Sequence, residues 1–342
     1  MPTQRLLHAI PVSILPRERL QFVRTTLQPG VHLQSMTGPL SRQVAQFSER
    51  LPISTGFVAT HLIVVHQNEY LSALDERLAK AGSSRNTGQF PSVDLDGIAR
   101  QVLVAITLCG RGVWEVAGHH TFDYSDADFP YGSAGYGHRP TQRVSDLLKY
   151  ASPNDWFLNV AASNLRSHCN KLDCYYRSGS WWVDRLSVAL GYLWSGLTTT
   201  QPELSFAALC MSIEAIASTS HNEITHILAE RCAVLISKDT TERLNMYREV
   251  KDLYSLRSKI IHGRSAPRRG AVNWETLAIT AKRSLIPVSA LFRMLGVTVS
   301  VINSVLSNAE LMAILHVRRD EDHASKALDE YFHLLILRRE AL

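Results

Sequence analysis

The chain has 342 residues, of which 45% are apolar and 20% are charged. This composition excludes a disordered or fibrous protein and predicts a folded core, and the length favours two domains. Only 8 of the 36 cationic residues are lysine. The positive charge is therefore mostly guanidinium, which suits phosphate groups better than the lysine ammonium does.

Nothing near the N-terminus has the form of a secretion signal, because Pro11 and Pro16 interrupt its apolar residues. The five cysteines lack the spacing of a disulfide framework, which favours a reduced cytoplasm. The segment closest to a membrane span is 284–306, but Arg293 lies at its centre and Pro287 near its start. We therefore expect a buried helix pair there and no contact with a membrane.

Residues 1–150 are expected to form a mixed α/β domain. Apolar runs with strand character lie at 57–65, 102–108 and 113–116, and helical patterns at 40–50 and 69–81. Gly110 and Gly112 predict a hairpin turn between the last two runs. Residues 119–140 are rich in Gly, Tyr, Asp and Pro and have no period, which predicts a long surface loop at the end of the domain.

Residues 151–342 are expected to form an all-α domain, which makes the whole chain an α+β protein. Segments with helical period lie at 154–167, 180–197, 203–219, 222–237, 240–262, 273–295 and 321–339. Pro202 is typical of a helix start, and Gly263 followed by Pro267 is typical of a helix end.

Two residues in the helix predicted at 240–262 attract attention. The spacing of Val250, Tyr254, Arg257 and Ile261 places the guanidinium of Arg257 in an apolar stripe, where a charge needs a partner or a function. His262 stands at the end of the same helix, where it can titrate near neutral pH. The structural alternative is a buried arginine paired with a glutamate, together with a histidine that caps the helix.

Glu214 and Arg231 are also charges among apolar residues of their predicted helices. One interpretation is a structural ion pair between these two residues, which fixes the register of two helices. The other is that Glu214 orients Arg257 or His262.

No metal or cofactor site is indicated. His168, Cys169 and Cys174 lie close together in sequence but lack a second pair of ligands with recognisable spacing. The chain also has no Gly-rich phosphate loop, no GxSxG and no HExxH motif.

The segment LYSLRSKIIHG at 253–263 resembles the signature of the HEPN superfamily, in particular its ApeA-like branch. Three earlier segments of the chain resemble, in the same order, the helices that precede this signature in the family: DRLSVALGYLWSGL at 184–197, FAALCMSIEAIAS at 206–218 and HILAERCAVLI at 226–236. The resemblance covers about 180–270, extends to about 295, and leaves the first half of the chain unmatched.

The resemblance implies a dimeric, HEPN-like helical bundle that cleaves RNA without a metal, with Arg257 and His262 as the catalytic pair. A proton-transfer group and a cation that stabilises a charged phosphorane suit this chemistry. Ser258 stands where many members carry Asn, Asp or His, and is expected to orient the site or contact phosphate. Tyr254 is expected either to stack a base or to lie in the core.

Three arginines in the loop after His262 are expected to bind the RNA backbone: Arg264, Arg268 and Arg269. By the resemblance, the expected partners are RNA such as tRNA, a second copy of the chain, and a regulatory partner or phage trigger in antiphage or toxin-like defence. The N-terminal half is then a sensor or regulator. The alternatives are a non-catalytic module that binds RNA, a nucleotide or a protein, with Arg257 structural, and an active N-terminal half using His119 and His120.

Overall fold

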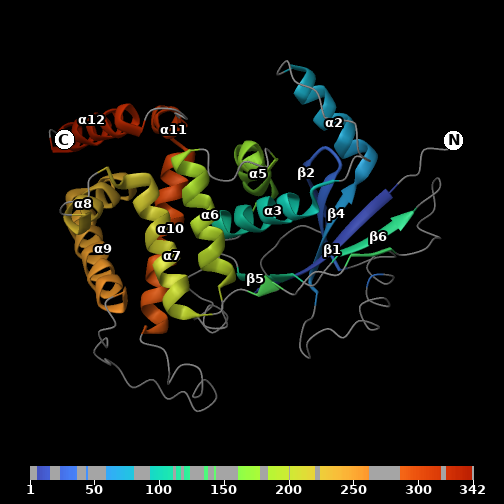
Figure 1. Ribbon diagram of the computed structural model, residues 1–342, viewed down its shortest axis with the longest axis horizontal. Coiled ribbons are helices and arrows are strands. Elements are labelled where there is room, and N and C mark those ends of the chain that lie inside the picture. The colour runs from blue at the N-terminus through green and yellow to red at the C-terminus, as the bar shows by residue number, and fades with distance from the viewer. Residues whose placement is uncertain are drawn as a thin grey trace, which may run out of the picture. The chain divides into compact units, whose positions relative to one another are not determined.

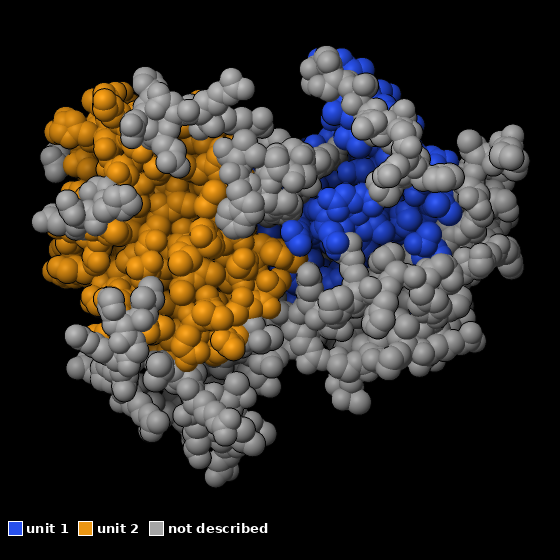
Figure 2. Space-filling model, in the orientation of Figure 1, with its two compact units in different colours: residues 1–143, 153–177 blue, residues 144–152, 178–342 orange. Residues whose placement is uncertain are grey.

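A computed structural model describes most of the chain. The described residues are 6–15, 24–36, 44, 59–80, 93–110, 113–116, 119–123, 135–137, 142–143, 161–177, 184–199, 201–219, 224–261, 286–316 and 321–340. The chain divides into two units, shown in different colours in Figure 2: residues 1–143 with 153–177, and residues 144–152 with 178–342. The first unit contains an antiparallel sheet with helices and the second contains helices among its described residues, which confirms the α+β class.

The first unit is built around an antiparallel sheet. Its strands are β1 (Leu6–Leu15), β2 (Arg24–Gln28), β3 (Val31–Ser35), β4 (His61–His66), β5 (Val113–Val116), β6 (His119–Asp123), β7 (Gly135–Gly137) and β8 (Gln142–Arg143). The strand order is β2-β3-β4-β1-β5-β8, and β6 pairs with β1 and with β7. A tight turn at Gly30, where φ is 71°, joins β2 to β3; glycine adopts this left-handed conformation without steric cost.

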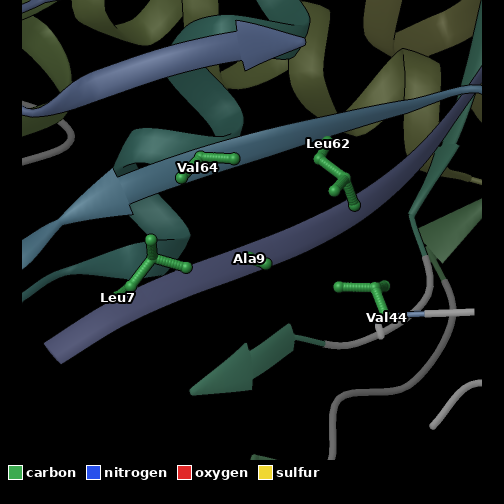
Figure 3. Close-up of a cluster of buried hydrophobic side chains, with 5 residues drawn as sticks. All are labelled: Leu7, Ala9, Val44, Leu62 and Val64. Carbon is green, nitrogen blue, oxygen red and sulfur yellow. The ribbon is translucent and has the colours of Figure 1, made fainter. Parts of the chain in front are cut away.

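Alternate residues of β1 and β4 form part of the core. Leu7 and Ala9 of β1 share one face of the sheet with Leu62 and Val64 of β4, and Val44 packs against them (Figure 3). Side chains of a strand alternate between faces, so one face gathers every second residue. The register Leu7 to His66 and Ala9 to Val64 places these apolar side chains together.

Three helices lie among the described residues of the sheet unit: α2 (Gln67–Lys80), α3 (Leu95–Gly110) and α5 (Ala162–Arg177). The expectation of a strand at 102–108 and a hairpin after it was wrong, because these residues lie in α3. Asp94 accepts a hydrogen bond from the Gly97 amide at 2.9 Å at the start of this helix. Residues 101–108 are all buried, and a helix buried on every side has the same continuous apolar pattern as a buried strand.

Other differences in this unit come from long-range pairing. Strands β1, β2 and β3 were not anticipated, and the expected surface loop at 119–140 contains β6 and β7. Strand β6 forms because it pairs with β1, with Phe122 opposite Leu7. The helix expected at 154–167 overlaps only the start of α5, which runs from Ala162 to Arg177 and packs against α3 and β2 in the sheet unit, and residues 154–160 lie outside the described residues. The helix expected at 40–50 lies outside the described residues except for Val44.

The second unit has seven described helices, which appear in green-yellow to red in Figure 1: α6 (Arg185–Thr198), α7 (Pro202–Ala217), α8 (Ile224–Ile236), α9 (Thr240–Ile261), α10 (Val288–Leu306), α11 (Ala309–Leu315) and α12 (Glu321–Glu340). Asp184 closes a capping box with Ser187 at the start of α6, and Pro202 begins α7 as predicted. Helices α6 and α7 approach closely, since the Ser205 hydroxyl donates to the Gly196 carbonyl.

Helix α10 is a long apolar helix of this unit. Its window Ser289–Leu306 is long and apolar enough to cross a membrane, and 72% of that window is buried inside the protein. Such burial is typical of the core helix of a soluble protein. It is one continuous helix rather than the expected pair, and Arg293 donates from Nε to Glu249 of α9 at 2.6 Å. The expected helix segment before it, 273–285, lies outside the described residues.

Candidate functional site

Arg257 lies near the C-terminal end of α9 and contacts Glu214 of α7. Its Nη2 lies 3.1 Å from Glu214 Oε1 and donates to Oε2 at 3.3 Å. The two side chains are 24% and 22% exposed. This contact is the glutamate pairing that the structural alternative expected, and Glu214 is also the residue expected to orient Arg257 in the other interpretation.

Tyr254 lies one turn before Arg257 and is part of the core. It is 3% exposed, and its hydroxyl donates to the Cys210 backbone carbonyl of α7 at 2.9 Å. A ring at this depth has no open face for a base, so the core interpretation of Tyr254 is confirmed and the stacking interpretation was wrong. The hydrogen bond gives α7 and α9 a second polar contact beside the ion pair.

The carboxyl group of Glu214 is destabilised as an anion. Burial raises its pKa above the usual value, and the nearby Arg257 guanidinium opposes this shift only in part. In addition, Arg257 Nε and Glu214 Oε1 are buried atoms with no hydrogen-bond partner among the described residues. The 3.1 Å contact between Arg257 Nη2 and Glu214 Oε1 is therefore an ion pair whose geometry does not form a hydrogen bond. Buried polar groups without a hydrogen-bond partner are few in folded proteins.

Arg231 does not pair with Glu214, so that interpretation was wrong. Its guanidinium contacts Asp329 of α12 and donates to the Ala217 carbonyl at 2.7 Å. It also lies 4.8 Å from the ring centroid of Phe332. Asp329 is 98 residues away in sequence, and no local pattern links the two residues.

Ser258, the residue after Arg257, is exposed on α9. Four other predicted site residues lie outside the described residues: His262, Arg264, Arg268 and Arg269. Because α9 continues to Ile261, chain connectivity alone keeps His262 near the end of the helix that carries Arg257. The geometry between these two side chains stays a prediction.

Metal ligands do not gather within the part of the chain that the structure describes, where no group of three His, Cys, Asp or Glu is arranged to hold an ion. His168 Nδ1 lies 3.2 Å from Cys109 Sγ and 2.9 Å from the Asn164 carbonyl. Burial raises the pKa of the Cys109 thiol to about 12, so this thiol is neutral and a poor metal ligand at physiological pH.

Comparison of the chain with family models, curated proteins and solved structures gives no match. The case for a function therefore depends on the residues of this chain and on their geometry.

Proposed function

We propose that the helical unit is a metal-independent endoribonuclease of the HEPN type. The observation that supports this proposal is the placement of Arg257. Its guanidinium is held by Glu214, remains 24% exposed, and lies one turn before the end of the helix that leads into His262. A cation that is fixed in position and still reaches solvent is suited to a phosphate that becomes more negative during reaction.

In the proposed reaction, the 2′-hydroxyl of a ribose attacks the adjacent phosphorus and the bond to the 5′-oxygen of the next nucleotide breaks. His262 accepts the hydroxyl proton or delivers a proton to the leaving oxygen. Arg257 stabilises the charge of the phosphorane, and Glu214 acts as a positioning residue for its guanidinium. The products are a 2′,3′-cyclic phosphate and a 5′-hydroxyl, and no step requires a metal or a cofactor.

A symmetric dimer would complete this site. Five residues along a helix correspond to a rotation of about 140°, so Arg257 and His262 do not share one face of a regular helix. A two-fold axis near the end of α9 brings two copies of each residue into one cleft. Ser258 is exposed beside Arg257 and would contact phosphate, while Arg264, Arg268 and Arg269 would bind the RNA backbone.

The biological setting follows from the resemblance to ApeA-like proteins. We propose a cytoplasmic antiphage or toxin-like nuclease, with the sheet unit as the sensor of a phage trigger or regulatory partner. Because one fold hosts many functions, the nuclease chemistry is the first part to test.

The test is incubation of the full chain with total RNA and a defined tRNA in EDTA, followed by mapping of the cut ends. Wild type is expected to leave 2′,3′-cyclic phosphates, and His262→Ala is expected to leave the RNA intact. Arg248→Ala is a matched control, because Arg248 is an exposed arginine of the same helix away from Glu214. Equal cleavage by wild type and His262→Ala would contradict the assignment.

The alternative is a non-catalytic module that binds RNA, a nucleotide or a protein. The observation that favours it is the same ion pair, since Arg257 and Glu214 also join α9 to α7. Arg257→Lys separates the two functions, because lysine keeps the charge but not the planar geometry. If the protein is a nuclease, Arg257→Lys is expected to lose cleavage while its melting temperature changes little. If Arg257 is only structural, the variant is expected to have a lower melting temperature, and neither it nor wild type cleaves RNA.

A further inference from the structure

The C-terminal half of α12 presents an apolar stripe on its outer face. Leu334 is 48% exposed and Leu337 is 47% exposed, whereas Leu328 and Phe332 of the same helix are 0% and 1% exposed. The inner face of α12 therefore packs on the helical unit and the outer face does not. Leucines with nearly half of their surface in water are a recognised sign of an interaction surface when they lie together.

The exposed stripe belongs to a helix that is held in place. Asp329 contacts Arg231 of α8, and Arg185 of α6 donates to the Ser325 hydroxyl at 3.1 Å. The Asn308 amide, just before α11, donates to the Tyr331 hydroxyl. These contacts hold α12 at Ser325, Asp329 and Tyr331, on the turns that precede Leu334.

The charges beside the leucines are arranged in a defined order. Glu330 is one turn before Leu334 and Arg338 is one turn after it, and both are exposed. Positions separated by four residues lie on the same side of a helix. Along the outer face, the sequence is thus an acid, then two leucines, then a base.

We propose that this stripe is a self-association surface, on which α12 of a second copy of the chain packs antiparallel with Leu334 near the two-fold axis. In this arrangement each Glu330 lies opposite Arg338 of the partner subunit, and the leucines of both copies cover one another. A parallel arrangement would place Glu330 beside Glu330 of the partner subunit and Arg338 beside Arg338 of the partner subunit. The order of charges therefore selects the antiparallel pairing, in which a two-fold axis perpendicular to the helices relates the same patch on both copies.

This surface is distinct from the site proposed for RNA cleavage. In Figure 1, α12 lies at the top of the helical unit, whereas α9 ends at the bottom. The inference therefore does not depend on the proposed function. If both two-fold contacts form, they link the chains into a closed tetramer or an open filament, because a second isologous contact extends a dimer.

The test is sedimentation velocity of the full chain over a range of concentrations. One helix pair buries less surface than a typical stable complex, so a weak, concentration-dependent association is expected. Glu330→Arg and Arg338→Glu each replace two attractive contacts by two repulsive ones, and each should raise the dissociation constant by about tenfold. The double variant Glu330→Arg/Arg338→Glu restores the attraction and should associate like wild type. Arg248→Glu is the control for an exposed charge reversal elsewhere.

A second variant, Leu334→Glu, places two carboxylates at the two-fold axis and should abolish this association without lowering the melting temperature, since Leu334 is exposed. A wild-type chain that stays monomeric at every concentration would overturn the proposal. Association that is unaffected by Leu334→Glu, or a double variant weaker than both single variants, would also overturn it. RNA cleavage is measured separately, so failure of the nuclease proposal leaves these outcomes unchanged.

Discussion

Replacing Glu214 by glutamine distinguishes a positioning role from a structural one. Glutamine has the same shape and still offers a carbonyl oxygen to Arg257, but it lacks the charge. The raised pKa of Glu214 means that burial destabilises the carboxylate more than the Arg257 guanidinium stabilises it. Removing that charge should therefore change the free energy of unfolding by only about 1 kcal/mol.

The magnitude follows from the exposure of the pair. Fully exposed ion pairs contribute about 0–1 kcal/mol, and breaking a fully buried pair costs about 3–5 kcal/mol. The side chains of Arg257 and Glu214 are 24% and 22% exposed, so the pair is closer to the buried case. The neutral amide of glutamine nevertheless avoids most of the cost of breaking a buried pair, because it leaves no unpaired carboxylate. For a unit of this size, about 1 kcal/mol corresponds to a change of about 2–4 °C in melting temperature. The rate of RNA cleavage should fall by about 10- to 100-fold, because a misplaced catalytic group is costly.

The pH dependence gives an independent check. A carboxyl group whose pKa is higher in the folded protein than in the unfolded chain stabilises the fold at low pH, and this contribution is lost as the pH rises through the folded pKa. Glutamine does not titrate, so the Glu214→Gln variant lacks this pH-dependent loss of stability. Measured by urea unfolding, the variant should thus compare more favourably with wild type at pH 7 than at pH 4.

The matched control is Asp329→Asn, which disturbs a different ion pair of the same unit. Arg231 is 8% exposed, so loss of its carboxylate partner should lower the melting temperature while cleavage stays at the wild-type rate. Glu214→Gln with wild-type cleavage would refute the positioning role. A fall in melting temperature well beyond 4 °C would show that the ion pair is mainly structural.

Two further predictions concern the sheet unit. Burial lowers the pKa of His32 and of His61 to about 4. Because the unfolded chain binds protons more tightly, the stability of this unit should fall as the pH drops from about 6.5 towards 4. The expected result is a lower hydrogen-exchange protection factor in β3 and β4, with a smaller loss in a His61→Asn variant. Gly30→Ala should destabilise this unit by about 1–3 kcal/mol in thermal unfolding, since φ is +71° and the new Cβ would lie 2.5 Å from the Tyr70 backbone nitrogen. An unchanged melting temperature would contradict the second prediction.

The helical unit was largely predictable from the sequence. The helices expected at 180–197, 203–219, 222–237, 240–262 and 321–339 correspond to α6, α7, α8, α9 and α12. Amphipathic periodicity and helix starts such as Pro202 are local signals, so they predict the helices of a bundle without knowledge of its tertiary contacts. The need of Arg257 for an acidic partner was also readable, because a charge in an apolar stripe has to be compensated.

The sheet unit was much less predictable. Helix α3 has the apolar pattern of a buried strand, and β6 exists because β1, more than 100 residues earlier, supplies its pairing partner. Hydrogen bonds between distant strands have no local signature, and turn-rich composition predicted a loop where the pairing produces a strand.

The sequence by itself determined the α+β class, most of the helices after residue 180, and the presence of a charged residue in the apolar stripe of α9. Only the tertiary structure decided which acid compensates it, since the sequence left open whether Glu214 pairs with Arg231 or orients Arg257, and the packed helices pair Glu214 with Arg257 and Asp329 with Arg231. The physical reason is that helical periodicity is local, whereas an ion pair depends on which faces of distant helices meet. The same packing leaves the outer face of α12 in water while its inner face is buried.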